Sequence, residues 1–146
     1  MARKPASTLL HLGPGLANGL SNLHNAKKAG SGVVNIIGEH AATHIELDAP
    51  LTADIEGIAR PMSHWVRTSP SAETLGKDAA EAVQAAKIIP GQIVSLVLPS
   101  DTAWSSGGVI HPPLPNPSPR PFAEDVLDDA PRALTGPDSL LLLGGG

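Results

Sequence analysis

The sequence predicts an α/β fold, in which helices cover both faces of a parallel sheet. Short apolar runs alternate with longer segments of helical periodicity, as in the stretch from Leu9 to Glu39. The run from Val33 to Ile37 lacks the apolar–polar alternation of a strand with one wet face. Such a run is expected of a strand that is covered on both sides. Together these features predict a strand, a helix and a strand, the smallest unit of a parallel sheet.

The first strand is expected over residues 6–12, and a Gly-Pro-Gly turn at residues 13–15 ends it. The segment after this turn carries leucines at i, i+4 and i+7, which form one apolar stripe of a helix. These leucines are Leu16, Leu20 and Leu23. Lys27 and Lys28 follow where the helix dipole favours cations, and Gly30 is a natural stop for this helix.

The chain continues with a short helix expected over residues 52–59 and a strand over residues 62–68. Ser69 suits the N-cap of a further helix, because Pro70 then stands at the first helical position. The buried face of that helix is predicted to consist of Leu75, Ala79, Val83 and Ala86. Another strand is predicted from Ile93 to Leu98.

A change of composition follows this unit. Residues 104–121 contain six prolines in eighteen positions and lack the periodicity of a helix or a strand, so they are interpreted as an extended linker. A helix over residues 122–134 and an apolar strand over residues 139–143 are expected after it. A strand of leucines needs neighbours to cover it. We therefore interpret residues 122–146 as the start of a second α/β domain and the chain as a fragment.

The composition of the chain excludes several classes of protein. The chain of 146 residues has no cysteine, which excludes a disulfide scaffold and a zinc ribbon. No apolar run approaches the roughly 20 residues of a membrane helix, so we expect a cytoplasmic protein without a membrane partner. Residues 1–38 carry four basic and no acidic side chains, whereas the rest carries six basic and fourteen acidic ones. The basic residues come as two pairs without aromatic neighbours, so no nucleic-acid partner is expected.

Without any resemblance to a family, the glycine residues after the first strand indicate one function, the binding of a dinucleotide. Gly13, Gly15 and Gly19 follow a strand and open a helix, as in a dinucleotide-binding turn. Glu39 lies 20 residues beyond Gly19, near the position of a ribose-binding acid. Pro14 argues against this function, because it removes an N–H from the lip that would face a pyrophosphate. A non-catalytic dinucleotide-binding module, or an assembly fragment of a larger complex, is therefore kept as the alternative.

Several strings carry a resemblance to a known family. HLGPGLANGLSNLHNA, followed by VVNIIGEH, DAPLTADI and VSLVLPSD, resembles the thiamine-diphosphate-dependent enzymes, and within them the acetolactate synthase large-subunit-like proteins. Benzoylformate decarboxylase is a cousin in this resemblance. The similar strings extend over nearly all of residues 6–104. The resemblance implies that residues 1–103 are a partial, truncated domain that binds the cofactor's aminopyrimidine, and that residues 122–146 begin the family's central domain.

The resemblance also implies a chemistry. Family members decarboxylate a 2-keto acid, with or without carboligation, using thiamine diphosphate and Mg²⁺, and FAD is a further cofactor that the resemblance leaves open. A homodimer or tetramer is implied for full-length relatives. The family's catalytic glutamate lies some twenty residues upstream of the glycine turn, a position that this sequence does not contain. The Gly-Asp-Gly motif of the magnesium site is absent as well. We therefore expect the chain alone to be inactive.

Six residues match the family's site. His11 matches a histidine that meets substrate in the benzoylformate decarboxylase branch, and it is the catalytic candidate. The resemblance implies that the turn near the cofactor consists of Gly13, Pro14, Gly15 and Asn18. Glu39 stands where many relatives have Gln, and it completes the cofactor-binding candidates. Each of these residues also has a purely structural explanation, as a strand end, a turn or a helix start.

Two histidines, His40 and His44, are four residues apart and would share one face of a helix. A zinc site needs three or four converging ligands, and this spacing alone is not a metalloprotease motif. No metal site is therefore predicted within this chain.

Overall fold

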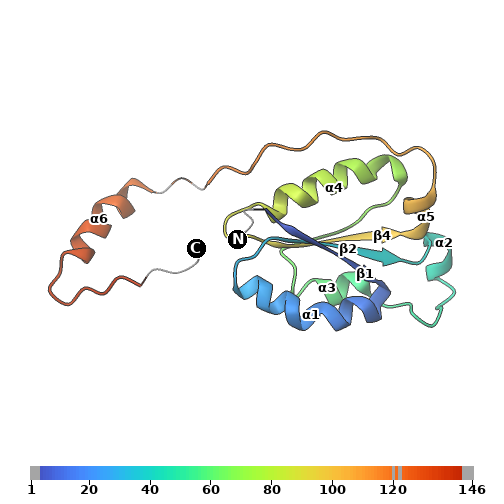
Figure 1. Cartoon of the computed structure of the whole chain (residues 1–146), viewed down its shortest axis with the longest axis horizontal. Coiled ribbons are helices and arrows are strands. Elements are labelled where there is room, and N and C mark those ends of the chain that lie inside the picture. The colour runs from blue at the N-terminus through green and yellow to red at the C-terminus, as the bar shows by residue number, and fades with distance from the viewer. Residues whose placement is uncertain (1–3, 120, 122, 143–146) are drawn as a thin grey trace.

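The structure is a computed structural model that describes residues 4–119, 121 and 123–142. Within these residues the chain forms four strands and six helices (Figure 1). In chain order they are β1 (Ala6–His11), α1 (Leu12–Lys28), β2 (Val33–Glu39), α2 (Ala42–Ile45), α3 (Ile55–Ala59), β3 (Trp65–Thr68), α4 (Ala72–Ala86), β4 (Ile93–Pro99), α5 (Ser100–Trp104) and α6 (Glu124–Leu134).

The four strands form one parallel sheet in the order β1-β2-β4-β3, which confirms the predicted fold class. Helices α1 and α3 lie on one face of this sheet and α4 lies on the other (Figure 1). The arrangement follows from the strand order. Crossovers between parallel strands are right-handed, so a chain that reverses its direction of travel across the sheet must cross on the opposite face. The chain moves from β1 through β2 to β3, and then returns to β4 through α4.

Two layers of apolar side chains hold the helices on the sheet. The layer under α1 and α3 contains Leu12, Leu16, Leu23, Val33, Ile37, Ile55, Ala59, Ile93 and Val97. The layer under α4 is smaller and contains Val34, Ala82, Ala86 and Val94. The central strands β2 and β4 contribute to both layers, as predicted for strands without a wet face. The predicted stripe of α1 is confirmed, with Leu20 partly buried beside its two buried partners.

A row of polar side chains crosses the same sheet face as the larger apolar layer. Thr8, Asn35 and Ser95 stand opposite one another in the register of β1, β2 and β4. The Thr8 hydroxyl donates to Asn35 Oδ1 at 2.7 Å, and Asn35 Nδ2 donates to Ser95 Oγ at 3.2 Å. The hydroxyl of Ser63 extends the row, because its oxygen lies 2.8 Å from Ser95 Oγ. Asn35 and Ser95 are fully buried, and these partners satisfy them.

The start of α1 differs from the predicted one. Leu12 is already the first helical residue, so Gly13, Pro14 and Gly15 form the first turn of the helix rather than a turn before it. The sharp change of direction falls on Leu12, whose φ is +56° although it is not glycine. Burial of its side chain compensates for this strained backbone, because Leu12 is only 3% exposed. Pro14 fits the first turn, where its missing N–H has no carbonyl partner to lose.

The end of α1 follows the prediction. Gly30 adopts the left-handed conformation, with φ +61°. Its N–H donates to the carbonyl of Lys27, and the N–H of Ser31 donates to the carbonyl of Ala26. These two bonds form a Schellman motif, which satisfies carbonyls that the helix end leaves free.

Helix α4 differs from its prediction in two respects. It begins at Ala72, and Ser71 rather than Ser69 is its N-cap. Its buried residues are Ala72, Asp78, Ala82 and Ala86, so the predicted face was wrong except for Ala86. Val83 is 42% exposed, because the apolar stripe that predicted the buried face points away from the sheet.

Ser69 and Asp78 instead tie β3 to α4. The fully buried hydroxyl of Ser69 donates to Asp78 Oδ2 at 2.8 Å, and Arg67 donates to Asp78 Oδ1 at 2.7 Å. Arg67 also pairs with Glu81, and its guanidinium lies 4.9 Å from the ring centre of Trp65. The hydrogen bond to Asp78 raises the pKa of Arg67, against a smaller lowering by burial.

The described part of the chain after the sheet is simpler. Residues 105–119 contain no helix or strand, as predicted, and run along α4 (Figure 1). The predicted helix over 122–134 is present as α6, although Phe122 lies outside the described residues. The predicted strand over 139–143 is wrong for residues 139–142, and Leu143 lies outside the description. An isolated strand has no partner for its backbone, and Leu140 and Leu142 are exposed here.

Candidate functional site

The carboxyl edge of the sheet is the candidate site. Open α/β sheets bind their ligands beyond the carboxyl ends of the strands, where successive connections leave toward opposite faces. The chain after β2 goes to α3 on one face, and the chain after β4 passes through α5 to the side of α4 (Figure 1). The crevice expected from this topology lies between the ends of β2 and β4. Glu39 and Pro99 are register partners there.

Asp101 links the chain after β4 to the chain after β2 at this edge. Both of its carboxylate oxygens lie 3.3 Å from the backbone nitrogen of Ala42, which donates to them. Ala42 is the first residue of α2, so the carboxylate caps this short helix and joins the two connections. No local sequence pattern indicates this contact, since 59 residues separate the two partners.

His11 ends β1 at the same edge and is exposed. Its register partner is Gly38, and a Cβ on that glycine would lie 3.8 Å from the Nδ1 atom of the His11 ring. The ring therefore lies beside Gly38, at a distance that would also leave room for a Cβ there. The location predicted for His11, at a strand end rather than in the core, agrees with the structure.

Glu39 shares the edge with His11 but points to the other face. Side chains alternate along a strand, so His11 and Gly38 belong to the α4 face and Glu39 to the face of α1 and α3. Glu39 Oε1 accepts a hydrogen bond from the backbone nitrogen of His40 at 2.8 Å. The two predicted residues thus lie on one edge without forming one cluster of side chains.

The glycines of the α1 start have different surroundings. A Cβ on Gly13 would lie 2.4 Å from the Cβ of Ala53, so close packing of α1 on the loop before α3 requires glycine at this position. A Cβ on Gly15 would meet His11 Cβ at 3.5 Å, an ordinary contact. The structural explanation is therefore sufficient for Gly13, whereas packing does not require the glycine at position 15.

Pro14 and Asn18 are both exposed and lie one helical turn apart. They form the part of the α1 start that a bound molecule at this edge is able to contact. Gly13 and Leu16 are buried, so the opposite side of the same turns is used in packing.

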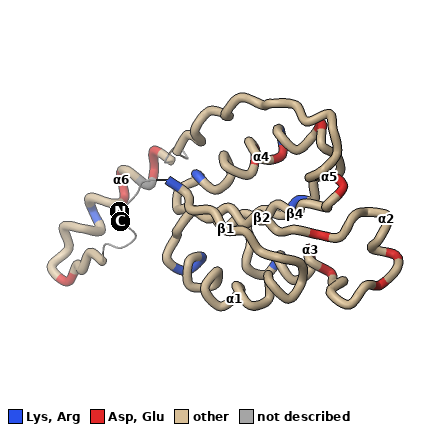
Figure 2. The backbone as a smooth tube through the Cα atoms, turned by 45° about the vertical axis from the view of Figure 1, so that its right-hand side comes forward, with Lys and Arg blue, Asp and Glu red and all other residues tan. Residues whose placement is uncertain are grey.

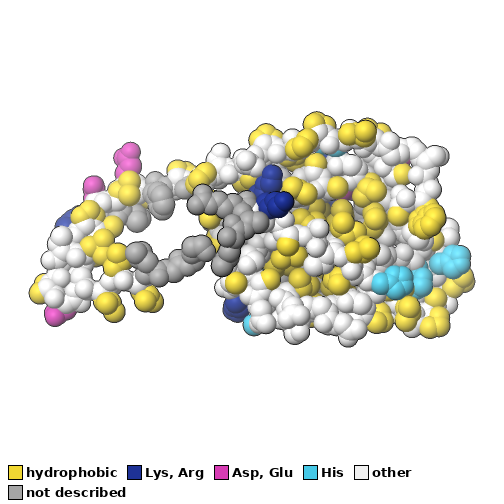
Figure 3. Space-filling view, viewed as in Figure 1, with side chains coloured by type: hydrophobic (Ala, Val, Ile, Leu, Met, Phe, Trp, Pro, Cys, Tyr) yellow, Lys and Arg dark blue, Asp and Glu magenta, His cyan; other side chains and the backbone are white. Residues whose placement is uncertain are grey.

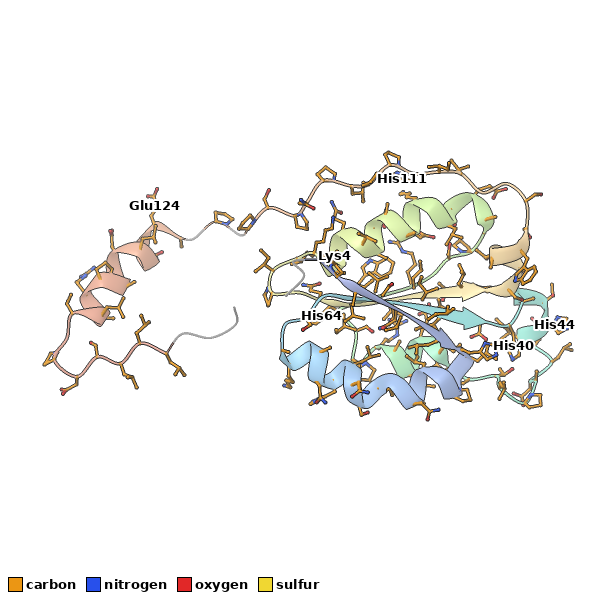
Figure 4. All side chains as sticks on the ribbon, viewed as in Figure 1. Lys4, His40, His44, His64, His111 and Glu124 are labelled. Atoms are coloured by element: carbon orange, nitrogen blue, oxygen red, sulfur yellow. The ribbon has the colours of Figure 1, made fainter. Side chains whose placement is uncertain are left out.

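His40 is a site residue that sequence reasoning missed. Its Nε2 atom is buried and has no hydrogen-bond partner. Buried polar atoms without a partner are rare in native proteins. The sequence drew attention to His40 only as one half of a pair with His44. Both residues lie at the carboxyl end of the sheet (Figure 4).

Charge is unevenly distributed over the molecule. Acidic residues gather at the carboxyl edge, around α2, α3 and α5, and the lysines in the last turn of α1 and near the amino terminus lie at the other end (Figure 2). A negatively charged edge disfavours the phosphates of a nucleotide and suits a neutral or cationic ring. Among the described residues, no three His, Cys, Asp or Glu side chains gather in a metal-binding arrangement.

Comparisons with known proteins support the family resemblance. Residues 1–60 match the family model of the thiamine pyrophosphate enzymes, N-terminal TPP binding domain. The Mycobacterium tuberculosis protein named "Putative acetolactate synthase large subunit IlvX" is 50% identical over 107 residues, which are 73% of this chain and 21% of IlvX. Residues 1–60 therefore match the N-terminal TPP binding domain of the thiamine pyrophosphate enzymes, and 107 residues of the chain are similar to an acetolactate synthase large subunit. This finding confirms the resemblance to acetolactate synthase-like proteins.

Two further relatives agree with this assignment. The acetolactate synthase large subunit IlvG of M. tuberculosis is 29% identical over 105 residues, which are 72% of this chain and 19% of IlvG. The thiamine diphosphate-dependent 4-hydroxybenzoylformate decarboxylase of Rhodococcus jostii has the same fold, with a TM-score of 0.72 at 20% sequence identity. That match covers 88% of this chain and 25% of the decarboxylase. The chain spans about a fifth of the length of the curated relatives it matches.

Proposed function

We propose that this chain supplies the aminopyrimidine-binding half of a thiamine diphosphate site in an enzyme that acts on a 2-keto acid. The reaction of the whole enzyme would be an acetolactate synthase-like decarboxylation, with or without carboligation. The observation that carries the proposal is the 50% identity to IlvX over 107 residues. That match covers 73% of this chain.

The residues of the carboxyl edge fit this cofactor. An aminopyrimidine presents donors and acceptors around a flat ring, and the carboxylate of Glu39 is a matching group at this edge. The Nε2 atom of His40 beside it is buried and has no partner. Pro14 and Asn18 are exposed on the first turns of α1, where they are able to contact such a ring. When bound, thiamine diphosphate supplies an electron sink for the decarboxylation of a 2-keto acid.

His11 is the proposed catalytic residue. It is exposed at the carboxyl end of β1, and its ring lies over Gly38, so a substrate at this edge is able to reach it. An imidazole at this position is suited to hold a proton for the substrate carboxylate or to deliver one, because its ring nitrogens can donate or accept a hydrogen bond.

Other parts of the proposal rest on the family alone. Mg²⁺ would be held outside this chain, and FAD remains a further candidate cofactor. A homodimer or tetramer is proposed for the whole enzyme, with a cytoplasmic location. Within the described residues, no helix is long and apolar enough to cross a membrane.

The site is tested by titrating the ¹⁵N-labelled chain with thiamine, thiamine diphosphate and NAD⁺. We expect thiamine and thiamine diphosphate to shift the same backbone resonances, at His11 to Asn18, Glu39 and His40, because the proposed site holds the ring that both share. NAD⁺ should leave them unchanged. Shifts with NAD⁺ alone would support the dinucleotide-binding alternative, and no shift with either thiamine compound would refute the site.

Two variants sharpen this titration. Glu39→Gln keeps the size of the side chain and removes its charge, so it should weaken the thiamine shifts if the carboxylate contacts the ring. Lys28→Ala at the opposite end of α1 is exposed and serves as the control that should leave the shifts unchanged.

A further inference from the structure

We propose that the outer face of α4 is a recognition groove for an extended proline-rich segment, and that residues 107–119 of this chain are its occupant. We call these residues the strap. The strap follows the side of α4 that points away from the sheet (Figure 1). In the proposal it is a fixed part of the folded unit, so residue 119 leaves the molecule at a defined place.

The contacts begin at the start of α4. Gly107 has a left-handed φ of +101°, and a Cβ there would lie 3.3 Å from the carboxylate of Glu73. A Cβ on Gly76 would lie 2.1 Å from the carbonyl oxygen of Val109 and 3.3 Å from the nitrogen of His111. The backbone of the strap thus lies directly on α4, at a position where only glycine leaves room for it.

Two polar side chains hold the strap near the end of α4. Gln84 Nε2 donates to the carbonyl of Pro115 at 2.8 Å, and Lys87 Nζ donates to Asn116 Oδ1 at 3.2 Å. An extended proline-rich chain has no internal hydrogen bonds, so its carbonyls are free to accept from a neighbouring surface.

Apolar side chains line the middle of the interface. A cavity of about 250 Å³ is bounded by Ala79, Ala80 and Val83 on α4 and by Pro113 and Leu114 on the strap. These α4 positions include two of the residues that the sequence predicted to be buried against the sheet. Figure 3 shows hydrophobic side chains along the upper rim of the molecule, where Figure 1 places the strap. The strap therefore explains why the outer face of α4 is apolar.

The contacts of the strap advance in one direction along α4. Gly107 lies at Glu73, and nine residues later Asn116 lies at Lys87, fourteen residues further along the chain of the helix. Each strap residue therefore accompanies about 1.6 helix residues, fewer than the roughly two expected of a straight, fully extended proline-rich chain, so the strap is less than fully extended. The strap is therefore laid along α4 over nearly its whole length, rather than crossing it once.

The path of the strap determines where the chain leaves the unit. The strap begins after α5 at the carboxyl edge and ends beside the turn between α4 and β4, where Pro117 and Pro119 line a second cavity with Ile89 and Gln92. Residues beyond the strap therefore leave at the amino edge of the sheet, away from the candidate site (Figure 1).

Distance measurements between two spin labels test the proposal. The chain has no cysteine, so Lys28→Cys and Ser118→Cys can be labelled alone, and both native residues are exposed. A docked strap should give one narrow distance distribution in the 146-residue chain. A broad distribution would overturn the proposal.

Substitutions in the groove give the second part of the test. In the doubly labelled chain, Gly76→Ala places a Cβ against the Val109 carbonyl and should broaden the distribution about twofold or more. The pair Gln84→Ala and Lys87→Ala should broaden it as well. Gly19→Ala on α1 and Lys77→Ala on α4 are the matched controls and should leave the width unchanged. A melting curve for each variant separates release of the strap from unfolding, and an unchanged width in both groove variants would refute the proposal.

Discussion

Gly13 and Gly19 belong to the same helix but have different surroundings. The space beside Gly13 is taken by Ala53, which is 40 residues away in the chain, whereas a Cβ on Gly19 would lie 3.6 Å from a methyl group of Leu10. Sequence spacing placed both glycines in one turn motif. It could not distinguish them, because the residue that fills the space beside Gly13 comes from a distant loop. The same limitation applies to Leu12, whose left-handed backbone has no signal in the residue type.

Substituting each glycine by alanine measures this difference. Gly13→Ala should lower the free energy of unfolding by about 1–3 kcal/mol, because the added methyl group overpacks a buried contact. Gly19→Ala should raise it by up to about 1 kcal/mol, since alanine favours the helix and meets no obstacle. Thermal or urea unfolding of the two variants checks both signs. Equal effects would mean that the contact with Ala53 does not constrain the start of α1.

His11 is the residue for which function and stability should separate. In a complete relative with the same LLHLGPG string, His11→Ala should lower the rate of decarboxylation by about 10²–10⁴-fold, the range for a positioned acid–base group. Its effect on stability should stay within about 0.5 kcal/mol, because the side chain is exposed. Steady-state kinetics and unfolding curves measure the two quantities. Normal turnover with a large loss of stability would make His11 a structural residue.

Helix α4 shows at the scale of elements what periodicity can and cannot predict. Its existence was predicted from the sequence. Its buried face was not predicted correctly. The helix has two apolar faces, one toward the sheet and one toward the strap, and periodicity alone does not tell which of them faces the sheet. Asp78 lies on the face toward the sheet, where it accepts from Ser69 and Arg67. A buried acid at that position is invisible to a search for apolar residues.

The contact between β3 and α4 should depend on Asp78 more than on Glu81. Asp78→Ala removes the strong acceptor of the fully buried Ser69 hydroxyl, which would retain only a 3.4 Å contact with Thr74. We expect a loss of about 1–3 kcal/mol of unfolding free energy, the cost of a buried polar group without a good partner. Glu81→Ala should cost less than about 1 kcal/mol, because its bond to the partly exposed Arg67 is screened by solvent. Urea unfolding compares the two, and a larger effect for Glu81 would contradict this assignment.

At the scale of the whole molecule, the sheet and its carboxyl edge were predictable, because they depend on strand order and parallel direction. The predicted site is only partly a cluster: His11 and Glu39 share the edge but belong to opposite faces of the sheet. The contact of Asp101 with Ala42 and the unpartnered His40 nitrogen come from connections that fold back on the edge. Residues far apart in the chain make these contacts, so no local pattern indicates them.

The isolated 146-residue chain should not catalyse decarboxylation. Purified protein with thiamine diphosphate, Mg²⁺ and pyruvate should release no carbon dioxide above the background of cofactor alone. The reason is that the sequence contains neither the family's catalytic glutamate nor its Gly-Asp-Gly magnesium motif. Turnover above background, abolished by His11→Ala, would show that residues within this chain are sufficient.

The polar row of Thr8, Asn35, Ser95 and Ser63 constrains how this sheet can change over evolution. Each hydroxyl or amide in the row satisfies its neighbour, so a single replacement such as Asn35→Leu leaves buried partners unsatisfied, at about 1–3 kcal/mol. Replacing the neighbouring positions together by apolar residues of similar shape can be nearly neutral. The four positions should therefore covary among relatives, polar as a set or apolar as a set. The row thus couples β1, β2, β4 and the segment before β3, so that substitutions at these positions are expected to occur together.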